Sequence, residues 1–80
     1  MHYVYILQGS DGRLCIGYSA DLRARLAAHQ EGRSRATRGR RWRLVYYEAY
    51  LDAATARRRE RQLKRSGVAR RAVMARRWRA

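Results

Sequence analysis

The chain has 80 residues and a formal net charge of +14, with 20 Lys and Arg against 6 Asp and Glu, and 46% of its residues are hydrophobic. A chain this short buries too little surface to form two cores, so we expect a single domain over residues 1–80, and its charge predicts a phosphate-rich partner such as DNA or RNA. The single cysteine, Cys15, excludes an internal disulfide and a cysteine-rich zinc site, while the lack of a signal sequence and of a long apolar run excludes a membrane span and predicts a cytoplasmic protein.

The first segment is predicted to form a β-hairpin. Tyr3–Leu7 is β-branched and aromatic, Gly9–Gly12 has the composition of a turn, and Leu14–Ile16 is a second apolar run. Because side chains alternate along a strand, Tyr5 should share a face with Tyr3 and Leu7.

A helix follows, from near Ala20 to about His29. Ser19 is the predicted cap at its start, and Leu22 and Leu26 would lie on one face.

Residues 33–43 are interpreted as a mobile basic loop, because they lack apolar periodicity and are rich in arginine. We expect this loop to contact the phosphate groups of nucleic acid. Its arginines are Arg33, Arg35, Arg38, Arg40, Arg41 and Arg43.

The last part of the chain contains the clearest strand, Leu44–Tyr50, and two predicted helices. Asp52 can cap a helix that runs through Lys64, and Ser66–Gly67 ends it before a last helix over Val68–Trp78. The apolar stripe predicted for the last helix consists of Val68, Ala72, Ala75 and Trp78. The order strand, strand, helix, strand, helix, helix predicts an α+β fold, with a small three-stranded antiparallel sheet flanked by helices.

Glu60 is the first candidate for chemistry. At 100° per residue it falls within the apolar stripe of Ala53, Ala56 and Leu63, so it should face inward. One interpretation is an ordinary ion pair with Lys64, four residues later. The other is a carboxylate that binds a divalent cation. The spacing alone fits both.

Arg25, His29 and Tyr5 are three further candidates. Arg25 and His29 are four residues apart and flank the apolar face of their helix, where they could bind phosphate and transfer a proton, or simply be solvated. Tyr5 is either a core aromatic or a catalytic phenol, and as a phenol it would need nearby positive charge to lose its proton near neutral pH.

Over essentially its whole length the sequence resembles the GIY-YIG nuclease family, and within it the small stand-alone bacterial branch. The first half of the family motif resembles Tyr3-Val4-Tyr5 and the second half resembles Cys15-Ile16-Gly17. The resemblance implies the GIY-YIG fold and assigns catalytic roles to Tyr5, Arg25, His29 and Glu60. Arg25 would contact phosphate, His29 would accept a proton, and Glu60, within Ala56–Glu60, would bind the metal.

Two positions depart from the family motif. Tyr3 replaces the glycine of the motif name, a replacement that is common in this branch. Cys15 replaces the second tyrosine, and a thiol is shorter than a phenol and a weaker hydrogen-bond donor. Cys15 is better interpreted as a small buried hydrophobe than as a reactive thiol. Tyr18 is three residues away from the motif position and is not expected to substitute for the tyrosine.

The resemblance implies a DNA endonuclease that uses one Mg²⁺ or Mn²⁺ ion, recognises backbone or branched or damaged DNA, and acts in DNA repair or recombination. A protein partner could supply targeting. The first alternative is a weakened or inactive nucleic-acid-binding module that keeps the same fold. The second is a basic protein that associates with ribosomal RNA. Phosphate contacts would make binding fall steeply with salt in either case.

Overall fold

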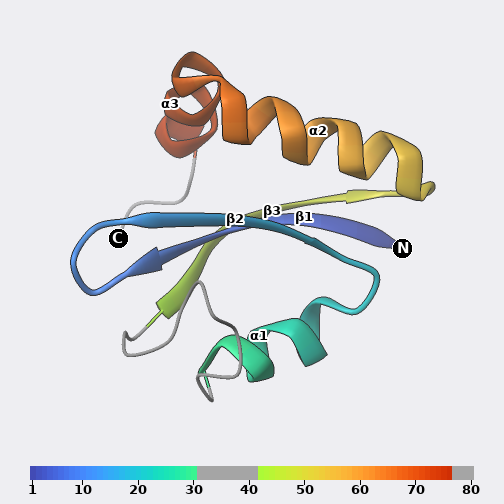
Figure 1. Ribbon diagram of the computed structural model, residues 1–80, viewed down its shortest axis with the longest axis horizontal. Coiled ribbons are helices and arrows are strands. Elements are labelled where there is room, and N and C mark those ends of the chain that lie inside the picture. Colours follow the sequence, from blue (N-terminus) through green and yellow to red (C-terminus); the bar gives the residue numbers. More distant parts are fainter. Residues whose placement is uncertain (31–41, 77–80) are drawn as a thin grey trace.

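The computed structural model of the chain describes residues 1–30 and 42–76, with only the backbone of residues 29 and 30 (Figure 1). The elements in chain order are β1 (His2–Gly9), β2 (Leu14–Ser19), α1 (Leu22–Gln30), β3 (Trp42–Tyr50), α2 (Ala53–Arg65) and α3 (Gly67–Arg76). This order and the α+β class confirm the prediction from sequence. In Figure 1, α2 and α3 cover one face of the sheet and α1 lies on the other. In the described part of the chain, no helix has the length and apolar character needed to span a membrane.

The sheet has the order β2-β1-β3, and both pairs of strands are antiparallel. β1 is therefore central, and Tyr5 pairs with Gly17 of β2 on one side and with Tyr47 of β3 on the other. The predicted hairpin turn joins β1 to β2. Gly12 adopts a positive φ of 87°, which favours glycine, and its N–H donates to the carbonyl of Gly9 at 2.9 Å.

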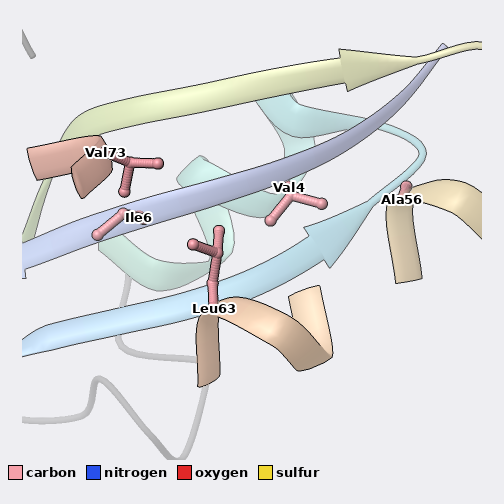
Figure 2. Packing of buried hydrophobic residues seen from close by; sticks show 5 residues of the cluster. All are labelled: Val4, Ile6, Ala56, Leu63 and Val73. Atoms are coloured by element: carbon pink, nitrogen blue, oxygen red, sulfur yellow. The ribbon is translucent and has the colours of Figure 1, made fainter. Parts of the chain in front are cut away.

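Alternate residues of β1 build two separate clusters on the two faces of the sheet. Val4 and Ile6 pack under α2 and α3, and Figure 2 shows them with the other buried members, Ala56, Leu63 and Val73. The opposite face carries Tyr5, Leu7 and Trp42, which pack with Cys15, Leu22, Leu26 and Leu44. The prediction that Tyr5 shares a face with Leu7 is confirmed, and this face is the one that α1 covers.

The start of α1 differs from the prediction. The helix begins at Leu22, and the Asp21 carboxylate accepts a hydrogen bond from the N–H of Ala24 at 3.1 Å, as a capping side chain does. The Ser19 hydroxyl accepts from the N–H of Asp21 at 2.9 Å and so forms the turn before the cap. Both residue types can cap, and the one nearer the helix does so. Asp52 caps α2 as predicted, accepting from the N–H of Thr55 at 2.7 Å.

The predicted loop 33–43 extends too far. β3 begins at Trp42, which is only 4% exposed, and Arg43 follows it in the strand. The large indole of Trp42 is buried in the core beside Leu7. Trp42 and Arg43 both pair with β1, so β3 begins two residues earlier than the predicted strand. The remaining arginines of the predicted loop lie outside the described residues.

The predicted apolar stripe of the last helix is wrong. Val68 is 69% exposed, and the inward residue is Val73, which is 1% exposed. The helix turns a different apolar set inward, since Ala69 and Met74 pack beside Val73 against the core. Arg70 also donates two 2.8 Å hydrogen bonds, to the carbonyl oxygens of Leu63 and Lys64 at the end of α2. Ala72 and Ala75, also in that stripe, are exposed, and Trp78 lies outside the described residues.

Candidate active site

Tyr5 and Gly17 form the centre of the candidate site. Tyr5 is on the central strand and 3% exposed, and its ring extends over β2, where a Cβ on Gly17 would overlap the phenol oxygen. Because Gly17 has no side chain, the Tyr5 ring of the central strand β1 can lie over the backbone of the edge strand β2. The hydroxyl group therefore lies near the β2 edge of the molecule.

Groups from three other elements act on the Tyr5 phenol. Burial raises the pKa of Tyr5 to about 12, Arg25 of α1 lowers the pKa, and Cys15 of β2 and Glu60 of α2 raise it. Three of the four residues predicted to be catalytic, Tyr5, Arg25 and Glu60, are thus coupled electrostatically.

The direction of the Tyr5 pKa shift corrects one expectation. A catalytic Tyr5 was expected to need nearby positive charge to lose its proton near neutral pH, and Arg25 supplies such a charge. Burial outweighs the effect of Arg25, so the pKa rises. Tyr5 is therefore a neutral phenol that can donate and accept hydrogen bonds.

Glu60 forms the ion pair that one of the two interpretations from sequence predicted. Its side chain is 21% exposed, and its Oε2 lies 3.3 Å from the Nζ of Lys64, so the predicted ion pair forms. Lys64 is 54% exposed. An ion pair so open to solvent contributes only about 0–1 kcal/mol, so it does not prevent the carboxylate from binding another cation.

The fit of a divalent ion can be judged from the donor set. The described residues contain no group of three or more His, Cys, Asp or Glu side chains that could hold a metal. Mg²⁺ commonly binds through one or two carboxylates together with water and substrate phosphate, without a cage made only of protein. The single Glu60 carboxylate fits that mode of binding, in which water and the nucleic acid complete the site.

Cys15 lies on the same face as Tyr5, where it pairs with Leu7 and is partly buried. Burial raises the pKa of its thiol, and Lys64 opposes this shift. The side chain packs with the cluster of Tyr5 and Leu7, as expected of a small hydrophobe. It also lines an open groove of about 580 Å³ with Leu14, Ile16, Lys64 and Arg70.

Tyr18 does not replace the missing motif tyrosine. It pairs with Val4, so it points to the face opposite Tyr5. Its hydroxyl oxygen lies 2.7 Å from Nδ1 of His2, and the guanidinium of Arg57 stacks 4.9 Å from its ring centre.

The other predicted residues are placed less completely. Arg43 pairs with Gln8, three residues along β1 from Tyr5 and on the opposite face, so the structure does not bring it to the candidate site. The side chain of His29 lies outside the described residues, as do Arg33, Arg35, Arg38, Arg40 and Arg41.

Sequence reasoning missed a polar cluster centred on Glu48 of β3. Nε and Nη2 of Arg59 donate to its two carboxylate oxygens at 2.9 and 3.0 Å, and the hydroxyls of Tyr46 and Tyr50 donate to them as well. Burial opposes ionisation of Glu48, but these hydrogen bonds outweigh it and lower its pKa. The alternation of Tyr46, Glu48 and Tyr50 in the sequence indicates that they share a face, but it does not indicate that Arg59 reaches them. The cluster ties α2 to β3 at the residue next to Glu60.

Three comparisons relate the chain to known proteins. The GIY-YIG catalytic domain matches residues 1–71. A UPF0213 protein of Staphylococcus aureus is 42% identical over 65 residues, which cover 79% of each chain. The solution NMR structure of a UPF0213 protein from Bacillus halodurans superimposes with a TM-score of 0.61 at 35% identity, covering 92% of this chain and 82% of that one.

Proposed function

The chain belongs to the GIY-YIG family, and on that premise we propose that it is a metal-dependent endonuclease that hydrolyses phosphodiester bonds of DNA. The observation that supports this proposal is the Tyr5 phenol reaching the β2 edge over Gly17, where Arg25 and Glu60 both act on it electrostatically.

Each residue has a role that follows from its chemistry. The exposed guanidinium of Arg25 binds the phosphate, for which its planar fork is suited. Tyr5, neutral because of its raised pKa, accepts a hydrogen bond from the attacking water and orients it. Glu60 would hold the divalent ion, which, when bound, supplies positive charge for the leaving oxygen. We assign proton acceptance to His29 on the family resemblance.

A nicking assay on supercoiled plasmid and on branched DNA, with Mg²⁺ or Mn²⁺, tests the proposal. Tyr5→Phe removes only the phenol oxygen, and Glu60→Gln removes only the charge. Both should lower cleavage by about two orders of magnitude or more, as loss of catalytic groups does. Tyr18→Phe is the matched control, because this tyrosine lies on the opposite face of β2. If all variants cleave as the native chain does, the activity comes from a contaminant.

The DNA is proposed to be recognised through its backbone or shape. The elements described carry no helix or strand with the side-chain pattern of a base-reading motif, whereas the net charge of +14 favours phosphate contacts. Branched or damaged DNA, as met in repair and recombination, is the substrate we would test first. RNA of matched length and shape is the comparison, and preferential cleavage of RNA would correct the substrate.

A nucleic-acid-binding module without catalysis is the second candidate. It is favoured by Cys15 in place of the second motif tyrosine. It predicts DNA binding that is independent of divalent ions and unchanged by Glu60→Gln, with no cleavage under any metal.

A further inference from the structure

A groove of about 400 Å³ opens on the α1 face of the sheet, and the proposed chemistry does not use it. Tyr3 and Tyr47 form its aromatic wall, with ring centres 6.2 Å apart and planes at 62°. Tyr47 is 54% exposed, so the face of its ring is open to a ligand in the groove. The other lining residues belong to α1 or precede it: Ala20, Asp21, Leu22, Arg23 and Leu26.

The groove adjoins the candidate active site. Tyr47 pairs with Tyr5 across β1 and β3, so both side chains lie on one face, and Tyr3 is two residues before Tyr5 on the same face. Leu22 and Leu26 line the groove and also pack against the cluster that contains Tyr5. In Figure 1 this is the face on which α1 lies. A strand whose phosphate is bound near Arg25 would therefore place a neighbouring nucleotide at the groove.

The chemistry of the groove suits a base better than a phosphate. Its two charged lining residues, Asp21 and Arg23, carry opposite charges, whereas the whole chain has a net charge of +14. The Asp21 carboxylate repels phosphate but can accept a hydrogen bond from the amino group of a base. Aromatic rings stack on the π-face of any base and discriminate little between sequences.

We propose that this groove binds one unpaired nucleobase next to the phosphate held at the active site. This inference rests on the proposed function for its position, but the binding itself needs no cleavage. Tyr47 is the stacking residue, and Tyr3 supports it edge-on. An apolar side chain of a protein partner could also fill such a groove, and the experiment separates the two occupants.

The test measures binding of a short fluorescent single strand by anisotropy, with a chelator present so that nothing is cut. Tyr47→Ala should weaken binding about tenfold, as expected for one lost base stack, and Tyr47→Phe should bind as the native chain does. A strand of equal length made of abasic sites keeps the phosphates and removes the bases. Tyr47→Ala should bind this strand as the native protein does.

Two results would overturn the base-binding groove. One is equal binding of the normal strand by the native chain and by Tyr47→Ala. The other is an equal loss with the abasic strand, which would show that Tyr47 acts on the fold or on phosphate. Thermal unfolding of Tyr47→Ala provides the check on folding. If Tyr47→Ala weakens base binding while Glu60→Gln leaves cleavage unchanged, the groove stands and the nuclease proposal fails.

Discussion

The phenol oxygen of Tyr5 occupies the space that a Cβ on Gly17 would fill. The two residues pair across β1 and β2, so the glycine allows a side chain from the central strand to reach the edge of the sheet. The second half of the family motif thus has a steric reason for its glycine in this chain. The two half-motifs therefore act together: Gly17 of the second leaves the space that the phenol of Tyr5, in the first, occupies.

Gly17→Ala should therefore remove activity without a change in any functional group. The added methyl must displace the Tyr5 ring, and such overpacking costs about 1–3 kcal/mol of stability. Urea unfolding and the nicking assay would be run on the same preparation. Gly67→Ala is the control, since a Cβ there would meet only arginine side-chain ends at 3.5 Å. Full activity in a folded Gly17→Ala would show that the position of the phenol does not matter.

The hairpin, the Asp52 cap and the inward orientation of Glu60 could be predicted because each depends on local sequence. Turn glycines, a capping carboxylate and helix periodicity act within a few residues. In this fold the tertiary packing keeps the local structure that each of them favours. The role of Glu60 in the chemistry comes from the family resemblance alone and stays a prediction.

The contact of Arg70 with α2 and the cluster around Glu48 could not be predicted in the same way. Arg70 reaches back to the end of α2, and Arg59 reaches across to β3, so both depend on how the elements pack. An arginine in a chain with 20 basic residues gives no sequence signal of its own. Trp42 was assigned to a loop because the arginines on both sides of it interrupt the apolar pattern by which a strand is recognised.

Glu48→Gln should destabilise the fold by about 2 kcal/mol, because it leaves the partly buried guanidinium of Arg59 without its counter-charge. The pKa of Glu48 is lowered from its usual 4.5, so the folded state binds fewer protons than the unfolded state over that range. The stability it contributes is complete above a pH of about 4.5 and is lost as pH falls through the folded pKa.

The measurement for Glu48 is urea unfolding as a function of pH. The native chain should lose stability below a pH of about 4.5, and Glu48→Gln should lose less over the same range. Glu60→Gln is the control, because its exposed ion pair should change stability by less than about 1 kcal/mol. If the two variants behave alike, the Glu48 cluster does not hold α2 to the sheet.

Tyr5 should ionise late in an alkaline titration. Its pKa is raised to about 12, so the stability it contributes is complete below the usual value of 10.0 and is lost as pH rises through about 12. Tyrosinate absorbance should show a late step, and Tyr5→Phe should reduce its amplitude by one tyrosine. Tyr50→Phe should also reduce it, since the pKa of Tyr50 is also raised to about 12. An unchanged late step in Tyr5→Phe would show that the phenol is not buried.

Lys64→Met should lower the concentration of Mg²⁺ needed for half-maximal cleavage. The ammonium lies 3.3 Å from the Glu60 carboxylate and competes with any other cation there, while methionine keeps most of the apolar stem. Removing an exposed competitor worth about 0–1 kcal/mol predicts a change of up to about fivefold. Arg65→Met, a neighbouring exposed cation on α2, controls for the loss of charge. The same shift in both variants would assign the effect to net charge and not to the pair.

Cys15→Tyr measures how much cleavage activity is lost because Cys15 replaces the second motif tyrosine. The thiol faces the same side as Tyr5 and borders an open groove into which a larger side chain can extend. The new hydroxyl group would add a hydrogen-bond donor at the β2 edge near Tyr5, so cleavage should rise by about tenfold or more.

Cys15→Phe is the matched control, since it adds the ring without the oxygen, and Cys15→Ser tests a small donor at the same place. A rise with Tyr alone would show that the scaffold is competent and limited by one missing hydroxyl. A rise with Phe as well would attribute the gain to packing against Leu7, which pairs with position 15. No rise in any variant, with folding intact, would mean that the thiol is sufficient in this branch or that the chain only binds nucleic acid. The Glu60→Gln nicking assay separates these two, because only the first leaves metal-dependent cleavage to lose.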